Sequence, residues 1–319
     1  MKIIFVFILL IAVCSTLLSF TIMLNSGSNE IKEMVIVDPG DTLRKIASNL
    51  VEKHIIRNKT TFMIVTYILQ KQHLLKPGKY VMQSNNILKI IQSLSERDAL
   101  VHKITIPEGL TTYQILDILQ KKEELFGTLS KDINEGELYP STYYIRHGDN
   151  INSLVNAMKQ QMYNTAEKLW HERNMSIPIA NKKDAIILAS IIEKEAANND
   201  EKSEISGVFI NRLYKKMKLQ SDPTVIYALT NGRWDLNRTL TKKDLQIPSE
   251  YNTYYISALP PAPITNPGYE SIKAALHPSK TDNLYFVSDD GCHIFSKTLK
   301  EHNAIRRKIK LKNIEQAAG

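Results

Sequence analysis

The sequence contains little cysteine: two residues, Cys14 and Cys292, in a chain of 319. Cys14 lies in an apolar run near one end and Cys292 lies near the other end, so we do not expect them to pair, and a disulfide framework is excluded. The eight histidines are scattered and do not show the His/Cys spacing of a zinc site. We therefore expect no metal and no cofactor.

Dense blocks of Lys and Arg interleaved with aromatic residues, which mark nucleic-acid grooves, are also missing. The chain is nevertheless basic, with a net charge of +8 and a pI of about 9.2. That sign suits anionic lipid or an anionic cell-wall polymer as a partner. The densest basic cluster, residues 306–312, is expected to be a solvated helix end, and we expect no nucleic-acid partner.

One long apolar run is present, because residues 3–24 contain no charged side chain. About 20 apolar residues cross a bilayer core as a helix. The run exceeds the apolar region of a signal peptide, typically about 7–15 residues, and no A-x-A-like cleavage site follows it. Lys2 is the only flanking basic residue, which places the N-terminus in the cytoplasm. We predict a cytoplasmic end at residues 1–2, a transmembrane helix at 3–24 and a linker at 25–33, with a cleaved signal peptide as the alternative.

After the linker, two segments share one pattern, at residues 35–56 and 103–125. Each is typical of a short strand, a Pro/Gly turn, a capping Thr and an amphipathic helix. With the helices and the strand expected between them, residues 34–100 form a small α+β module for binding or spacing. Residues 101–150 form the second strand–helix segment and a connection, residues 151–312 form a larger α+β domain, and residues 313–319 form a tail.

Two glutamates, Glu193 and Glu195, stand near the end of the apolar helical run "IILASIIEKEAANN", residues 186–199. Glu193 shares its helix face with small side chains such as Ala189 and Ala196, whereas Glu195 points roughly the opposite way. A carboxyl group on an apolar wall has a raised pKa and can serve as a general acid. The alternative is an ordinary glutamate at a helix end with a hydrogen-bonded partner.

Three later stretches, residues 219–229, 251–268 and 277–303, combine tyrosine with amide and hydroxyl side chains. Aromatic rings stack on sugar faces and amides both donate and accept, so these stretches suit a polyol ligand. Turn chemistry and core packing remain open as alternatives, and Asp222 before Pro223 is also a candidate helix cap. The candidate substrate-binding residues are Gln220, Ser221, Asp222, Thr224, Tyr251, Asn252, Tyr254, Asn266 and His277.

Ten short motifs in these regions carry a family resemblance: "IPEG", "EGELYPSTY", "LASIIEKEA", "VFINRL", "LQSDPTVIYAL", "YNTY", "LPPAPITNPG", "AALHP", "LYFV" and "EHN". In this order and spacing the chain resembles the membrane-bound endolytic murein transglycosylase family, also described as YceG-like. The resemblance implies a single-pass enzyme of the bacterial inner membrane with a LysM-like module at residues 34–100. It also implies that the catalytic glutamate is Glu193. Ser141 departs from the family pattern, which commonly has Asp there.

The resemblance implies cleavage of the MurNAc–GlcNAc β-1,4 bond of nascent glycan strands without water, which gives 1,6-anhydroMurNAc ends and terminates strand elongation, with peptidoglycan synthases as possible partners. One carboxyl group can serve as both acid and base in this reaction. A hydrolytic muramidase is one alternative, but it needs a second carboxylate, for which only Asp222 is a candidate. A non-enzymatic, membrane-anchored peptidoglycan-binding protein is the other alternative.

Overall fold

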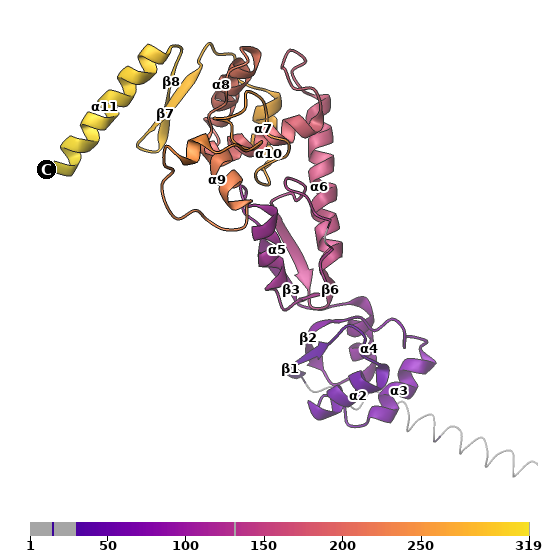
Figure 1. Cartoon of the computed structure of the whole chain (residues 1–319). Helices are drawn as coiled ribbons and strands as arrows, with labels where there is room; N and C mark the ends of the chain where they lie inside the picture. The colour runs from indigo at the N-terminus through magenta and orange to yellow at the C-terminus, as the bar shows by residue number, and fades with distance from the viewer. Residues whose placement is uncertain (1–14, 16–29, 131, 319) are drawn as a thin grey trace, which may run out of the picture. The chain divides into compact units, whose positions relative to one another are not determined.

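The computed structural model of the chain describes residues 15, 30–130 and 132–318, and these form a mixed α+β structure (Figure 1). Apart from Ser15, the transmembrane helix predicted for residues 3–24 lies outside the described residues. Among the residues that are described, no helix combines the length and the apolar character needed to cross a bilayer.

The chain divides into two compact units. The first unit comprises Met1–Ile104, Lys122–Thr128 and Tyr144–Ile151, and the second comprises Thr105–Lys121, Leu129–Tyr143 and Asn152–Gly319. The segment predicted as a connection, residues 101–150, is therefore shared between the two units.

The first unit contains an antiparallel strand pair with three helices. Its elements are β1 (Glu30–Val37), α2 (Leu43–Glu52), α3 (Lys59–Ile68), β2 (Gly78–Ser84) and α4 (Ile87–Glu96). This is the order of strands and helices that the sequence predicts for residues 34–100. Its own hydrophobic core is built from both strands and all three helices and includes the fully buried Leu50, Phe62, Tyr80 and Ile91.

Short polar side chains begin these helices by accepting hydrogen bonds from free backbone N–H groups. Thr42 Oγ1 accepts from Lys45 N at 3.2 Å, and Asn58 Oδ1 accepts from Thr60 N at 2.8 Å. The sequence offers both Thr111 and Thr112 as the cap of the next helix, and Thr111 holds this position, in a capping box in which Gln114 Oε1 accepts from the Thr111 backbone N–H. These starts are local features of the sequence, which is why they could be predicted.

Residues 101–150 contain two short strand pairs and one helix. β3 (Val101–Thr105) pairs with β5 (Thr142–Arg146), β4 (Leu125–Phe126) pairs in parallel with β6 (Asp149–Asn150), and α5 (Thr112–Gln120) follows β3. The rest of the second unit is mainly helical: α6 (Ile151–His171), α7 (Lys182–Glu195), α8 (Lys202–Tyr214), α9 (Asp222–Thr230), the 3₁₀ helix η1 (Asp244–Gln246), α10 (Tyr269–Leu276), the hairpin of β7 (Tyr285–Asp289) and β8 (Cys292–Ser296), and α11 (Leu299–Ala318). α11 continues through most of the segment predicted as a tail.

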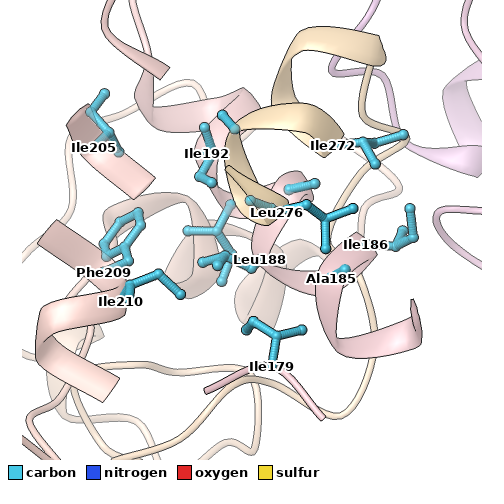
Figure 2. Packing of buried hydrophobic residues seen from close by; sticks show 14 of the residues in the cluster. Ile179, Ala185, Ile186, Leu188, Ile192, Ile205, Phe209, Ile210, Ile272 and Leu276 are labelled. Atoms are coloured by element: carbon cyan, nitrogen blue, oxygen red, sulfur yellow. The ribbon is translucent and has the colours of Figure 1, made fainter. Parts of the chain in front are cut away.

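α7 is the central helix of the second unit. Its residues from Ala185 to Ile192 are all buried, so the helix is apolar on every side and packs between neighbours. Figure 2 shows Leu188 and Ile192 of α7 beside Leu276 of α10 and Phe209 of α8. The polar end of α7 begins only after Ile192, and this places the two glutamates at the edge of the core.

Candidate active site

Glu193 is tied to two neighbouring segments by both of its carboxylate oxygens. Lys202 Nζ, at the start of α8, donates to Glu193 Oε1 at 3.1 Å, and the backbone N–H of Gly268, just before α10, donates to Oε2 at 2.9 Å. Both side chains of the ion pair are almost fully buried, with 8% of Glu193 and 5% of Lys202 exposed. These contacts hold the carboxyl group between the start of α8 and the loop before α10. They correspond to the alternative that the sequence left open, a glutamate with a hydrogen-bonded partner.

Glu195, the last residue of α7, carries a carboxyl group with a raised pKa. It keeps a partly accessible edge, yet the loss of water around its carboxyl group raises its pKa to about 7. The negative charge of Asp222 adds to this rise, while the Ser221 hydroxyl and the charges of His293 and Arg212 oppose it. The two glutamates diverge as expected, and two of the candidate substrate-binding residues, Ser221 and Asp222, lie near Glu195.

Ser221 and Asp222 enter this site at the start of α9. Ser221 is 1% exposed, and its Oγ has no partner in hydrogen-bond geometry among the described residues. Asp222 is exposed, and Tyr254 OH donates to its Oδ1 at 2.6 Å. Burial and the Asp222 charge raise the pKa of the Tyr254 phenol, so it remains a hydrogen-bond donor at neutral pH.

The prediction that Asp222 caps α9 is wrong. Ser221 holds the cap position and Asp222 is the first residue of the helix, followed by Pro223. Because Pro223 has no backbone N–H and the Asp222 carboxylate bonds to Tyr254 instead, the side chain of Asp222 is directed to the site rather than to its own helix.

Three of the candidate substrate-binding residues are structural. Asn252, Thr224 and Asn266 are all 0% exposed. Asn252 Nδ2 donates to Leu245 O at 3.1 Å and to Ile247 O at 2.9 Å, and Thr224 Oγ1 donates to Ser221 O at 2.6 Å. These side chains shape loops from beneath, so the prediction that they contact substrate is corrected: their polar atoms are already used by the protein.

Asn266 joins three loops. Its Oδ1 accepts from Leu138 N at 2.8 Å, and its Nδ2 donates to Thr112 Oγ1 and to Glu135 Oε1, each at 3.0 Å. Burial raises the pKa of Glu135, whereas hydrogen bonds from Thr112 oppose that rise. The sequence analysis did not single out Glu135, although it lies in the quoted motif "EGELYPSTY".

The remaining candidates differ in their surroundings. Gln220 is exposed beside Ser221, and its positive φ of 52° turns the chain into α9. The ring of Tyr251 lies 4.9 Å from that of Tyr227, so it is part of an aromatic pair at the edge of the core. His277 ends α10 through its backbone N–H, which donates to Lys273 O. Asp222 and Tyr254 are therefore the predicted residues that lie near Glu195 with accessible side chains, and Gln220 is exposed two residues before Asp222.

His293 and Glu201 form a pair that the sequence analysis did not identify. Glu201 Oε2 lies 2.8 Å from His293 Nδ1, and Glu201 Oε1 accepts from the His293 backbone N–H at 2.7 Å. Although burial opposes it, these bonds lower the pKa of Glu201. The pair fixes the imidazole at the hairpin β7–β8, from where its positive charge lowers the pKa of Glu195. Within the part of the chain that the structure describes, no group of three or more His, Cys, Asp or Glu side chains could hold a metal ion.

The chain matches one family of proteins over most of its length. The YceG-like family model matches residues 35–308, and the chain belongs to the YceG-like family. The family resemblance seen in the motifs is thereby confirmed.

Individual relatives agree with the family. An endolytic murein transglycosylase of Bacillus subtilis is 33% identical over 305 residues, which cover 85% of this chain and 83% of the relative. The endolytic murein transglycosylase of Streptococcus pneumoniae D39 is 26% identical and matches 84% of this chain but 56% of its own length, so it is the longer protein. A crystal structure of a YceG-like protein from Listeria monocytogenes is 33% identical, with a TM-score of 0.52, over 87% of this chain and 100% of that chain.

Proposed function

We propose that the protein is an endolytic murein transglycosylase, a lyase that cleaves the MurNAc–GlcNAc β-1,4 bond of nascent peptidoglycan strands without water. Membership of the YceG-like family and the names of the relatives support this activity. The observation that carries it is the match of the YceG-like family model to residues 35–308. We propose Glu195, whose pKa burial raises to about 7, as the carboxyl group that donates and accepts the proton.

The chemistry needs one carboxyl group in two successive steps. Protonated Glu195 gives its proton to the glycosidic oxygen as the bond from this oxygen to C1 of MurNAc breaks. The resulting carboxylate takes the proton of the C6 hydroxyl of the same MurNAc as this oxygen bonds to C1. Glu195 ends protonated, GlcNAc leaves with a free 4-hydroxyl, and the other product carries a 1,6-anhydro ring. No water is consumed and no second carboxylate is required.

The proposal therefore assigns the role of acid and base to Glu195, whereas the sequence motifs assign it to Glu193. Lys202 and Gly268 occupy both oxygens of Glu193. Around Glu195, the Ser221 hydroxyl and the Asp222–Tyr254 pair can orient sugar hydroxyl groups.

The mass of the products tests the reaction. Purified glycan strands are digested with the protein, and the new ends are analysed by mass spectrometry. Ends that are lighter by one water than hydrolytic ends support the lytic reaction. Hydrolytic masses would instead support a muramidase that uses Asp222 as a second carboxylate, and no new ends would leave only a binding function.

We further propose that the chain is a single-pass protein of the bacterial cell membrane, with a cytoplasmic N-terminus and both units outside the cytoplasm. The uncharged run at residues 3–24 and the single flanking Lys2 support this orientation. The strand–helix–helix–strand order of residues 30–84 supports a LysM-like, glycan-binding role for the first unit. Peptidoglycan synthases are the proposed partners, which crosslinking in cells followed by co-purification can detect.

A further inference from the structure

The outward face of α3 in the first unit is apolar. Ile64, Tyr67 and Ile68 are 48%, 55% and 65% exposed, although the opposite face of the same helix buries Phe62 and Val65 in the core. Positions 64, 67 and 68 lie on one side of a helix because they are three and four residues apart. Scattered exposed apolar residues are ordinary, but a continuous stripe of large ones on one short helix indicates a contact surface.

The stripe continues into the turn that follows the helix. Leu69 is 42% exposed and Leu74 is 51% exposed. The backbone N–H of Leu74 donates to Lys71 O at 2.9 Å, so this turn is ordered against the end of α3. We call Ile64, Tyr67, Ile68, Leu69 and Leu74 the α3 face.

The chain around the α3 face is strongly basic. Residues 53–95 contain no aspartate or glutamate, and this stretch supplies seven of the eight net positive charges of the whole protein. The basic residues in it are Lys53, Arg57, Lys59, Lys71, Lys76, Lys79 and Lys89. Lys59 at the start of α3 and Lys76 after the turn are exposed. The sequence around the apolar stripe is thus net positive, with exposed lysines before and after it.

We propose that the α3 face docks onto the surface of an anionic lipid bilayer. Large aliphatic and tyrosine side chains enter the boundary between headgroups and acyl chains, while lysines around them contact anionic headgroups. A protein partner fits less well, because lysine is depleted at protein–protein interfaces. A glycan strand also fits less well, because Ile64, Ile68 and Leu74 offer no hydrogen-bonding group to its hydroxyls.

The position of the first unit in the sequence keeps it close to a bilayer. Five residues, 25–29, separate the apolar run at 3–24 from the start of β1 at Glu30. Even when fully extended, such a segment reaches roughly 20 Å. The docking proposal rests on the proposed membrane anchor and is independent of the proposed catalytic activity.

Fluorescence quenching in vesicles tests the docking. The full chain carries Cys14→Ser and Cys292→Ser, and a single cysteine replaces Ile68 and bears an environment-sensitive fluorophore. It is reconstituted into vesicles of phosphatidylglycerol and phosphatidylcholine that contain a spin-labelled quencher lipid. The matched control carries the cysteine at Met175, an apolar residue of the second unit that is 76% exposed. Resistance to alkaline carbonate extraction reports on the anchor separately.

We expect the quencher to reduce the fluorescence at position 68 and to leave the fluorescence at position 175 unchanged. The loss shrinks as salt rises from 0.1 to 1 M, since the screening length falls from about 10 to about 3 Å. It also shrinks in phosphatidylcholine alone and with Lys59→Glu plus Lys76→Glu. An anchored protein without quenching at position 68 would overturn the proposal. If the fluorescence change instead depends on the amount of protein per vesicle and not on the fraction of anionic lipid, the α3 face binds a second copy of the chain. That result would also overturn the docking proposal.

Discussion

Lys202 Nζ lies 3.1 Å from Glu193 Oε1 in an ion pair that is almost entirely buried. The pair fastens the end of α7 to the start of α8, and Gly268 fastens the same carboxylate to the loop before α10. Glu108 Oε2 lies 3.6 Å from the same ammonium group. Glu193 thereby holds in place the helix end that presents Glu195.

Lys202→Met is expected to destabilise the protein by about 3–5 kcal/mol, because it leaves the buried Glu193 carboxylate without its ion-pair partner. Urea unfolding measures the change. The control is Lys194→Met: Lys194 is exposed and its Nζ makes only a 3.4 Å bond to Gly109 O, so little change is expected. The double variant Glu193→Gln/Lys202→Met recovers part of the loss, and a double variant no more stable than Lys202→Met would count against the pair.

Glu195→Gln is expected to lower strand cleavage by about 10²–10⁴-fold, since the isosteric amide cannot give or take the proton. Glycan release measures it, and thermal unfolding checks that the fold is kept. Glu193→Gln is the paired variant and should lose stability but retain cleavage at a temperature where it is folded. The opposite pattern, with Glu193→Gln folded and inactive, would identify Glu193 rather than Glu195 as the catalytic acid.

The rate is expected to fall as pH rises through about 7, where Glu195 loses the proton needed for the first step. The same group affects stability. Its pKa is raised in the folded state from 4.5 to about 7, so its stabilising contribution is complete below pH 4.5 and is lost as pH rises to about 7. Urea titrations between these pH values should show a steeper decline for the wild type than for Glu195→Gln. Equal slopes would contradict the raised pKa.

His293→Gln is expected to move the alkaline limb of the rate profile to higher pH. The imidazolium charge lowers the pKa of Glu195, so its removal allows Glu195 to keep its proton longer. Glu201→Gln should act in the same direction, because it weakens the two bonds that hold His293. His277→Gln is the control and should leave the profile unchanged. A rate profile that is unchanged by His293→Gln would show that His293 does not influence the pKa of Glu195.

Asn266→Leu is expected to lower stability rather than substrate affinity. It leaves Leu138 N, Thr112 Oγ1 and Glu135 Oε1 without a bond that each makes to Asn266, and an unsatisfied buried polar group costs about 1–3 kcal/mol. Calorimetry measures the stability, and KM of the folded protein is compared with the wild type. A raised KM with unchanged stability would restore Asn266 as a substrate contact.

The sequence by itself determined the local features of this protein. The caps at Thr42 and Thr111, the apolar run of α7 and the strand–helix order of the first unit follow from residues close together in the chain. The ordered motifs also determined the family, which the comparisons confirmed.

Only the tertiary structure decided what surrounds each of the two glutamates. Helical periodicity shows that Glu193 and Glu195 diverge, but it does not show what each one meets. Gly268, 75 residues from Glu193 in the sequence, binds the Glu193 carboxylate together with Lys202. The start of α9 and the hairpin β7–β8 bring Ser221, Asp222 and His293 to Glu195. The pKa of a carboxyl group depends on the water and the charges around it, and in this protein those come from segments that only folding brings together.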